Sequence, residues 1–142
     1  MTDQTTFFDE TAAFYDATYE PQDIDDVEFY VERARAADGP VLEAACGTGR
    51  VYLELLAAGV DADGFDGAPE MLSELRSRAA ERDLEPSVWE ADMRDFEVDR
   101  EYALIIVPFR SFLHLVELED QRSALRQFHD ALAPDGELII AV

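Results

Sequence analysis

One stretch decides the fold of this chain: residues 41–66 read VLEAACGTGRVYLELLAAGVDADGFD. Residues 41–46 are apolar and predict a buried strand, residues 50–58 are typical of a helix, and residues 60–65 return as a strand. Asp66 follows directly at the end of that second strand. A strand–helix–strand unit of this kind sets backbone N–H groups and a helix N-terminus against a bound ligand.

The residues around the glycine turn indicate which ligand it is. Gly47 and Gly49 fit the start of the G-x-G-x-x-G pattern of dinucleotide sites, but Tyr52 holds the third position, where its ring would crowd the helix against the strand. Glu43 precedes the turn, and its charge would repel a pyrophosphate but suits an ammonium group. Asp66 is placed to accept hydrogen bonds from ribose hydroxyls. A ribose joined to a charged amino acid fits best, which matches S-adenosylmethionine.

Four segments of the chain also resemble, in order, the motifs of the class I S-adenosylmethionine-dependent methyltransferases. They are EAACGTGR at residues 43–50, GFDGAPEML at 64–72, ADMRDF at 91–96 and PDGEL at 134–138. The resemblance covers roughly residues 40 to 142. Two positions depart from the family pattern, since Ala45 and Asp135 stand where glycines are usual.

The rest of the chain continues the alternation of strands and helices. Further strands are expected over residues 87–91, 102–107 and 138–142. Helices are expected with apolar faces made by Phe8, Ala12, Tyr15 and Tyr19; by Ile24, Val27, Val31 and Ala34; by Met71, Leu72, Leu75 and Ala79; and by Leu118, Leu125, Phe128 and Leu132. The expected fold is α/β: a doubly wound, Rossmann-like parallel sheet in the order 3-2-1-4-5.

The chain is expected to form a single domain over residues 1–142, with residues 1–38 as an N-terminal helical lid and residues 39–142 as the core. The family normally continues past the fifth strand with a helix and an antiparallel strand pair, which this chain lacks. We therefore expect a truncated chain, a gene fragment or a partner that completes the sheet. An exposed apolar edge strand could also pair with a second copy and give a homodimer.

The resemblance implies a cofactor site drawn from all four motifs. Glu43 would bind the ammonium group, Asp92 and Met93 the adenine, and Pro108 would lie by the transferred methyl group. Met71 would pack beside the adenine, and Tyr15, like Tyr19, would cover the carboxylate end of the cofactor. Plainer readings stay open: a helix cap for Asp92, and core packing for Met71 and the tyrosines. The cofactor-binding candidates are Glu43, Ala45, Gly47, Gly49, Asp66, Met71, Asp92, Met93, Tyr15 and Pro108.

The catalytic residue is not identified by the sequence. His114 is a candidate general base because its pKa lies near neutrality, although packing among its apolar neighbours is the favoured reading. Arg110 is a candidate for holding a substrate carboxylate, or it balances neighbouring acids. The segment after the fourth strand lacks the Asn/Asp-Pro-Pro-Tyr motif of families that methylate nucleic-acid bases or glutamine.

The composition is strongly acidic, with 33 Asp and Glu against 11 basic residues, all arginine, and a formal net charge of −22. Small domains are comfortable with a net charge of magnitude about 2–8, so this charge indicates a halophilic protein screened by concentrated salt. The rival reading is a protein that binds basic partners, but the acids are spread along the chain. Nucleic acid is a poor partner because the arginines form no cluster.

The remaining composition favours a cytoplasmic setting. Cys46 is the single cysteine, so no internal disulfide and no cysteine-based metal site is expected. No apolar run of membrane-spanning length or signal-peptide type is found, so no membrane partner is expected.

Methyl transfer from S-adenosylmethionine to a small-molecule acceptor is the favoured function. The alternatives are a non-catalytic cofactor-binding fragment or subunit that needs a partner and, less favoured, a nicotinamide-dependent reductase, which Tyr52 argues against.

Overall fold

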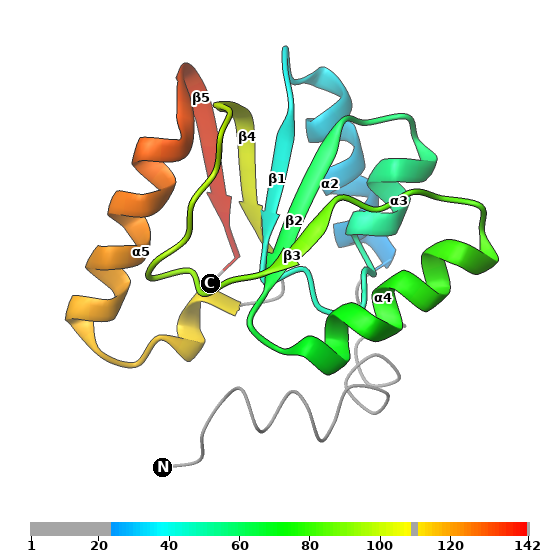
Figure 1. The fold of residues 1–142 in the computed structure, drawn as a ribbon. Helices are drawn as coiled ribbons and strands as arrows, with labels where there is room; N and C mark the ends of the chain where they lie inside the picture. Colours follow the sequence, from blue (N-terminus) through cyan, green and yellow to red (C-terminus); the bar gives the residue numbers. More distant parts are fainter. Residues whose placement is uncertain (1–23, 109–110, 142) are drawn as a thin grey trace.

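The computed structural model describes residues 24–108 and 111–141 (Figure 1). The expected first helix, with Tyr15 and Tyr19, and the candidate Arg110 lie outside the described residues. The elements follow in the order α2 (Ile24–Ala36), β1 (Val41–Ala44), α3 (Tyr52–Ala57), β2 (Ala62–Asp66), α4 (Pro69–Glu81), β3 (Val88–Glu90), β4 (Tyr102–Val107), the 3₁₀ helix η1 (Ser111–His114), α5 (Leu118–Ala131) and β5 (Leu132–Ile140).

The five strands form one parallel sheet in the order β3-β2-β1-β4-β5, which confirms the predicted topology. Val41 of β1 lies opposite Ala62 on one side and Leu104 on the other, so β1 is the central strand. The strand arrowheads point to the lower edge of the sheet in Figure 1. The loops that leave β1, β2 and β4 therefore meet along that edge, where open α/β sheets bind ligands.

Helices cover both faces of the sheet (Figure 1). On one face α2, α3 and α4 pack against alternate strand residues such as Val41 and Leu104. On the other face α5 packs against Leu42, Ile105 and the aromatic ring of Phe65. The three inner strands β2, β1 and β4 are almost wholly buried, whereas the edge strands β3 and β5 are partly exposed. Burial on both faces is why β4 is a nearly continuous apolar run. The predicted inner face of α4 is confirmed, because all four of its residues are buried.

The ring of Tyr52 does not crowd α3 away from the sheet, so that part of the sequence interpretation is wrong. Tyr52 is fully buried, and its hydroxyl donates to the carbonyl of Ala62 at 2.7 Å and accepts the N–H of Ser87 at 2.9 Å. The ring fits because Gly64 lies beneath it: a Cβ on Gly64 would stand 3.3 Å from Tyr52 Cδ1 and 3.2 Å from Cys46 Sγ. A glycine in β2 therefore makes room for a tyrosine in α3.

The buried face of α5 is confirmed at Phe128 but differs from the prediction at its leucines. Leu118 and Leu125 are 62% and 42% exposed, whereas Ala124, Phe128 and Ala131 are buried. The helix turns two small alanines toward the sheet and leaves larger leucines at its rim. Residue size misled the prediction, because close approach of a helix to a sheet favours small side chains at the contact.

Several element ends differ from the expected ones. β1 stops at Ala44 because the next residue, Ala45, has a positive φ of 56°. β5 begins at Leu132 rather than at residue 138, with a register shift opposite Tyr102. At that irregularity a Cβ on Gly136 would stand 2.8 Å from the carbonyl oxygen of Tyr102, so the close approach of β5 to β4 there requires glycine. Across the two described ranges, every helix is too short or too polar to span a bilayer.

Candidate functional site

The loop after β1 reverses the chain through left-handed backbone. The φ angles of Ala45, Gly47 and Gly49 are 56°, 58° and 93°. A Cβ on Gly49 would stand 2.9 Å from Leu53 Cγ and 3.0 Å from Leu75 Cγ, so only glycine fits between α3 and α4. A Cβ on Gly47 would meet no atom within 4 Å, so the backbone there borders open space. The first glycine thus faces outward to where a ligand can approach, and the second is needed for packing.

Asp66 ties this loop to the end of β2. Its Oδ2 accepts the N–H of Gly47 at 2.8 Å, and its Oδ1 accepts the N–H of Ala68 at 2.9 Å. Burial raises the pKa of Asp66, while the bonds from Ala68 and Gly47 lower it in part. Each carboxylate oxygen has two lone pairs, so each keeps one acceptor position for a further donor such as a hydroxyl.

Glu43 is a buried carboxylate with an incomplete set of hydrogen bonds. It lies in the central strand opposite Gly64 and Ile106, and it is 1% exposed. Its Oε1 is buried and has no hydrogen-bond partner. Burial raises the pKa of Glu43 well above its usual range, and the nearby negative charge of Asp66 raises it further. A cationic donor would satisfy the oxygen and offset both effects, so the residue fits an ammonium group.

Asp92 lies just after β3, in the loop that leads toward β4. Its Oδ1 accepts the backbone N–H of Arg94 at 2.8 Å, and the Arg94 guanidinium also pairs with the carboxylate. The hydrogen bond from the Arg94 side chain lowers the pKa of Asp92, so this carboxylate stays charged. Asp92 therefore stabilises a turn, and the helix-cap reading is wrong because no helix begins in the described stretch between β3 and β4. Its partnership with Arg94 was not predicted.

The remaining candidates lie at different depths. Met71 is 3% exposed and belongs to the buried face of α4, which favours the core-packing reading. Met93 is partly buried against the core on the α5 face, and Pro108 is buried directly after β4. His114 ends η1 and is partly buried. Within the described part of the chain, no group of three or more His, Cys, Asp or Glu side chains could hold a metal ion.

Comparison with known proteins gives consistent relatives. A family model described as "Methyltransferase domain" matches residues 41–136. The glycine/sarcosine N-methyltransferase of Halorhodospira halochloris is 32% identical over 116 residues, which cover 80% of this chain and 43% of that protein. The solved structure of SAM-bound CalS10, an amino pentose methyltransferase from Micromonospora echinaspora, has a TM-score of 0.77 at 28% identity, covering 89% of this chain and 55% of that chain.

A third relative extends over nearly all of the chain. The dTDP-3-amino-3,6-dideoxy-alpha-D-glucopyranose N,N-dimethyltransferase of Streptomyces fradiae is 27% identical over 143 residues, which cover 96% of this chain and 54% of that protein. The chain spans about half the length of the curated relatives it matches, since it covers 43% and 54% of the two named above.

The left-handed backbone at Ala45 generates a prediction about stability. Left-handed backbone destabilises the folded state by about 1–2 kcal/mol at a residue with a Cβ. Glycine avoids this strain, but it loses more backbone entropy on folding, which destabilises the folded state by about 0.5–1 kcal/mol. Ala45→Gly should therefore raise the free energy of unfolding by about 0.5–1 kcal/mol in urea denaturation. Ala57→Gly, at the exposed last residue of α3, is the control and should lower it, by up to about 1 kcal/mol. Similar losses in both variants would contradict the assignment of strain.

The buried carboxylate at Glu43 generates a prediction about pH. The carboxyl group of Glu43 has a higher pKa in the folded protein than in the unfolded chain, where the pKa is about the usual 4.5. The free energy of unfolding of the wild type therefore falls as the pH rises from the unfolded-state pKa to the folded-state pKa. The loss is up to about 1.4 kcal/mol per pH unit for one carboxyl. Glu43→Gln should flatten that slope and be more stable than wild type at pH 8, measured by ligand-free denaturation.

Glu119→Gln is the control for that series, because Glu119 lies on the exposed first turn of α5. It should keep the wild-type slope. A Glu43→Gln variant with the wild-type slope would mean that the buried carboxyl does not carry the pH dependence.

Proposed function

The chain belongs to the family of methyltransferase domains, and on that premise we propose that it binds S-adenosylmethionine and serves methyl transfer to a small-molecule acceptor. The observation that carries the proposal is the pair of acids at the ends of β1 and β2. Glu43 presents a buried oxygen without a partner, and Asp66 keeps two acceptor positions beside the open face of Gly47. An ammonium group and a ribose are the complements of these two carboxylates.

The rest of the cofactor follows from the same edge of the sheet. The adenine is assigned to the loop after β3, where Asp92 would accept its exocyclic amine and Met93 would give apolar cover. The open backbone at Gly47 allows close approach of the amino-acid part. Pro108, at the end of β4, borders the region proposed for the methyl group. Ala45 adds a small side chain that keeps this approach clear.

The bound cofactor would supply a methyl group that its sulfonium already makes electrophilic. The chain's own task is then to hold the cofactor in one orientation and to exclude water, since positioning alone contributes much of the rate of such reactions. His114 would be needed as a base only for an acceptor that arrives protonated. Its place at the end of η1 puts it on the segment that follows β4.

Small amines are the acceptors we propose to test first. The relatives named above act on glycine and sarcosine and on amino sugars, according to their names. The chain covers 43% and 54% of the two curated relatives, so their acceptors serve here as the choice of substrates to test. A domain that binds the cofactor without transferring methyl groups is the alternative, and assays with glycine, sarcosine and an amino sugar separate the two.

A nicotinamide-dependent reductase is less well supported. A dinucleotide requires two phosphates near the first glycine loop, and the charge of the buried Glu43 carboxylate would repel them.

Ligand-dependent melting tests the cofactor assignment. S-adenosylmethionine and S-adenosylhomocysteine at 100 times their dissociation constants should stabilise the protein by about 2.7 kcal/mol, and NAD should not. Asp66→Asn should lose most of this shift, because the amide cannot accept two hydroxyls and two N–H groups as the carboxylate does. Asp130→Asn, at an exposed position in α5, is the matched control and should keep the full shift.

Stabilisation by NAD but by neither adenosyl ligand would revive the reductase. A folded sample that responds to no ligand would contradict the cofactor assignment.

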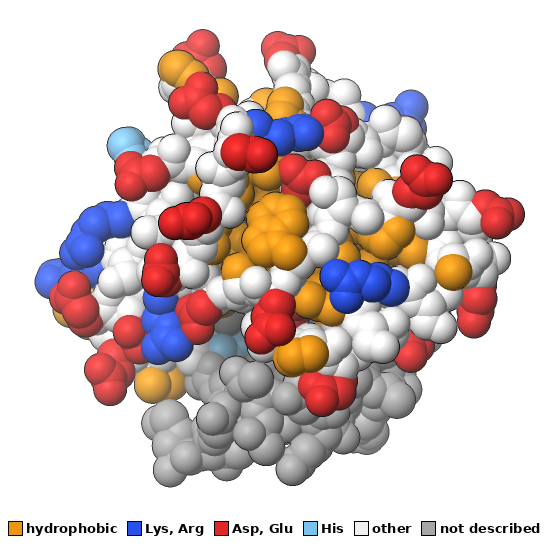
Figure 2. All heavy atoms as spheres, in the orientation of Figure 1, with side chains coloured by type: hydrophobic (Ala, Val, Ile, Leu, Met, Phe, Trp, Pro, Cys, Tyr) orange, Lys and Arg blue, Asp and Glu red, His pale blue; other side chains and the backbone are white. Residues whose placement is uncertain are grey.

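We further propose that the chain works in concentrated salt, in the cytoplasm of a salt-accumulating organism. Figure 2 supports this: red Asp and Glu side chains are distributed over the visible face rather than gathered into one patch. A dispersed charge of −22 gives repulsion without a docking surface. Salt near 1 M shortens the screening length to about 3 Å and removes most of that repulsion.

The melting temperature should therefore rise by about 10 °C or more between roughly 0.1 M and 2 M KCl, which corresponds to about 2–3 kcal/mol. Sucrose at matched osmolality is the control, because it favours compact states without screening charge, and its effect should be smaller. Equal melting temperatures at low and high KCl would contradict the proposal.

A further inference from the structure

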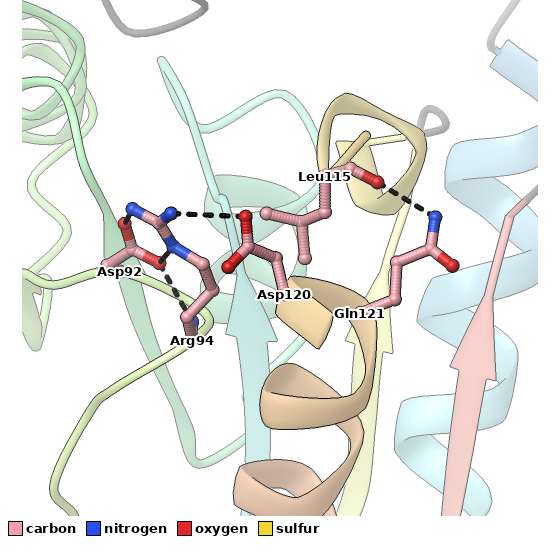
Figure 3. Close-up of polar contacts among 5 residues, drawn as sticks. All are labelled: Asp92, Arg94, Leu115, Asp120 and Gln121. Carbon is pink, nitrogen blue, oxygen red and sulfur yellow. Dashed lines mark hydrogen bonds and ion pairs between the residues drawn. The ribbon is translucent and has the colours of Figure 1, made fainter. Parts of the chain in front are cut away.

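Arg94 donates three hydrogen bonds to the carboxylate of Asp92 (Figure 3). Its Nε donates to Oδ1 at 2.9 Å, its Nη2 donates to Oδ2 at 2.7 Å, and its backbone N–H donates to Oδ1 at 2.8 Å. A planar guanidinium that pairs through two nitrogens sets both the position and the plane of a carboxylate. The Asp92 side chain is thus held in one orientation although it is 47% exposed.

These three hydrogen bonds limit what else the Asp92 carboxylate can bind. A carboxylate offers about four acceptor positions, two on each oxygen. Oδ1 accepts two hydrogen bonds and Oδ2 accepts one, so one position stays open, on Oδ2. One open acceptor matches one N–H of an exocyclic amine.

The same guanidinium reaches a second element. Arg94 Nη1 donates to Oδ2 of Asp120, in the first turn of α5, at 3.4 Å. The next residue, Gln121, donates from Nε2 to the carbonyl of Leu115 at 2.8 Å, just past the end of η1 (Figure 3). The start of α5 therefore contacts the loop after β3 on one side and the segment after β4 on the other.

A second bond braces the loop after β3 on the same helix. The backbone N–H of Phe96 donates to Oε1 of Gln127 in α5 at 3.1 Å, and the centroid of the Phe96 ring lies 5.7 Å from that of Phe128, with the two ring planes tilted by 43°. The loop that carries Asp92 is thus attached to α5 by a charged contact, an amide contact and an aromatic contact.

We propose that Arg94 is a positioning residue for recognition of the adenine: it presents Asp92 with a single acceptor on Oδ2 and fixes the loop against Asp120 of α5. The inference rests on the proposed function, because it deepens the adenine part of that site. Stability alone does not account for this arrangement, since ion pairs with side chains 34–47% exposed contribute little to folding. A bidentate ion pair can fix the orientation of the Asp92 carboxylate even when it adds little to the free energy of folding.

The test compares two ligands that differ at the purine 6-position and at N1, which is an acceptor in adenine and an N–H in the inosine analogue. The N1 difference is the same for every variant, so a change in the preference between variants reports on Asp92. S-adenosylhomocysteine carries the exocyclic amine, and its inosine analogue carries an oxygen there, which cannot donate to Asp92. Dissociation constants of both are measured by calorimetry in concentrated KCl for the wild type, Arg94→Gln, Arg94→Lys, Asp120→Asn and Arg126→Gln. Arg126 is the matched control, because it is an exposed α5 arginine that faces Glu119 at 3.5 Å and its loss changes the charge equally.

The wild type should prefer the adenosyl ligand by about tenfold or more, as expected for one hydrogen bond to a charged acceptor. Arg94→Gln should reduce this ratio by about three- to tenfold, equivalent to losing about half of that bond. Arg94→Lys should also reduce it, because an ammonium keeps the charge but cannot form the fork. Asp120→Asn should have a smaller effect, and Arg126→Gln none.

An unchanged ratio in both Arg94 variants would overturn the inference, as would an equal drop in Arg126→Gln. A wild type that binds both ligands without preference would overturn it as well, while leaving cofactor binding intact. A wild type that binds neither ligand would instead refute the proposed function. Melting curves of each variant separate a loss of fold from a change in preference, since a merely structural role would weaken both ligands equally.

Discussion

The arrangement of the site depends on one carboxylate. Asp66 accepts the N–H of Gly47 from the loop after β1 and the N–H of Ala68 from the loop after β2. These two bonds hold two adjacent loops of the sheet in register at its carboxyl edge. The glycine loop passes through left-handed backbone at Ala45, Gly47 and Gly49. It is held in this conformation because Gly47 is bonded to Asp66 at the end of β2. The ligand-binding edge is organised before any ligand arrives.

That organisation has an electrostatic cost. Glu43 and Asp66 are both raised in pKa by burial, and the charge of Asp66 adds to the effect on Glu43. Two desolvated carboxylates close together destabilise the ligand-free protein, and a cationic ligand would relieve them. Sites that are poised for a ligand often carry such a conflict. At Asp92 the opposite holds, because Arg94 satisfies the carboxylate within the chain and keeps it charged.

The sequence predicted elements best where a local pattern is strong. The strand order and the buried face of α4 are confirmed, because alternating strands and helices leave few parallel topologies and helical periodicity is a local property. The buried face of α5 was predicted only in part, since Phe128 is buried as expected but Leu118 is exposed while Ala124 is buried. The hydrogen bonds from Arg94 to Asp92 were not predicted either. The sequence shows only an arginine two residues after an acid, and the two side chains pair because the loop turns back between them.

By itself, the sequence determined that this is a parallel sheet with a glycine turn after one strand and an acid at the end of the next. Those features follow from the order and pattern of strand-like and helix-like segments along the chain, together with the residues at their ends. The tertiary structure alone decided that Gly64 gives room to Tyr52, that Glu43 keeps an oxygen without a partner, and that Arg94 joins Asp92 to α5. Each of these features depends on which distant residue lies next to the side chain in the folded protein. Packing between helices and strands determines those neighbours, and the periodicity within a helix or strand does not.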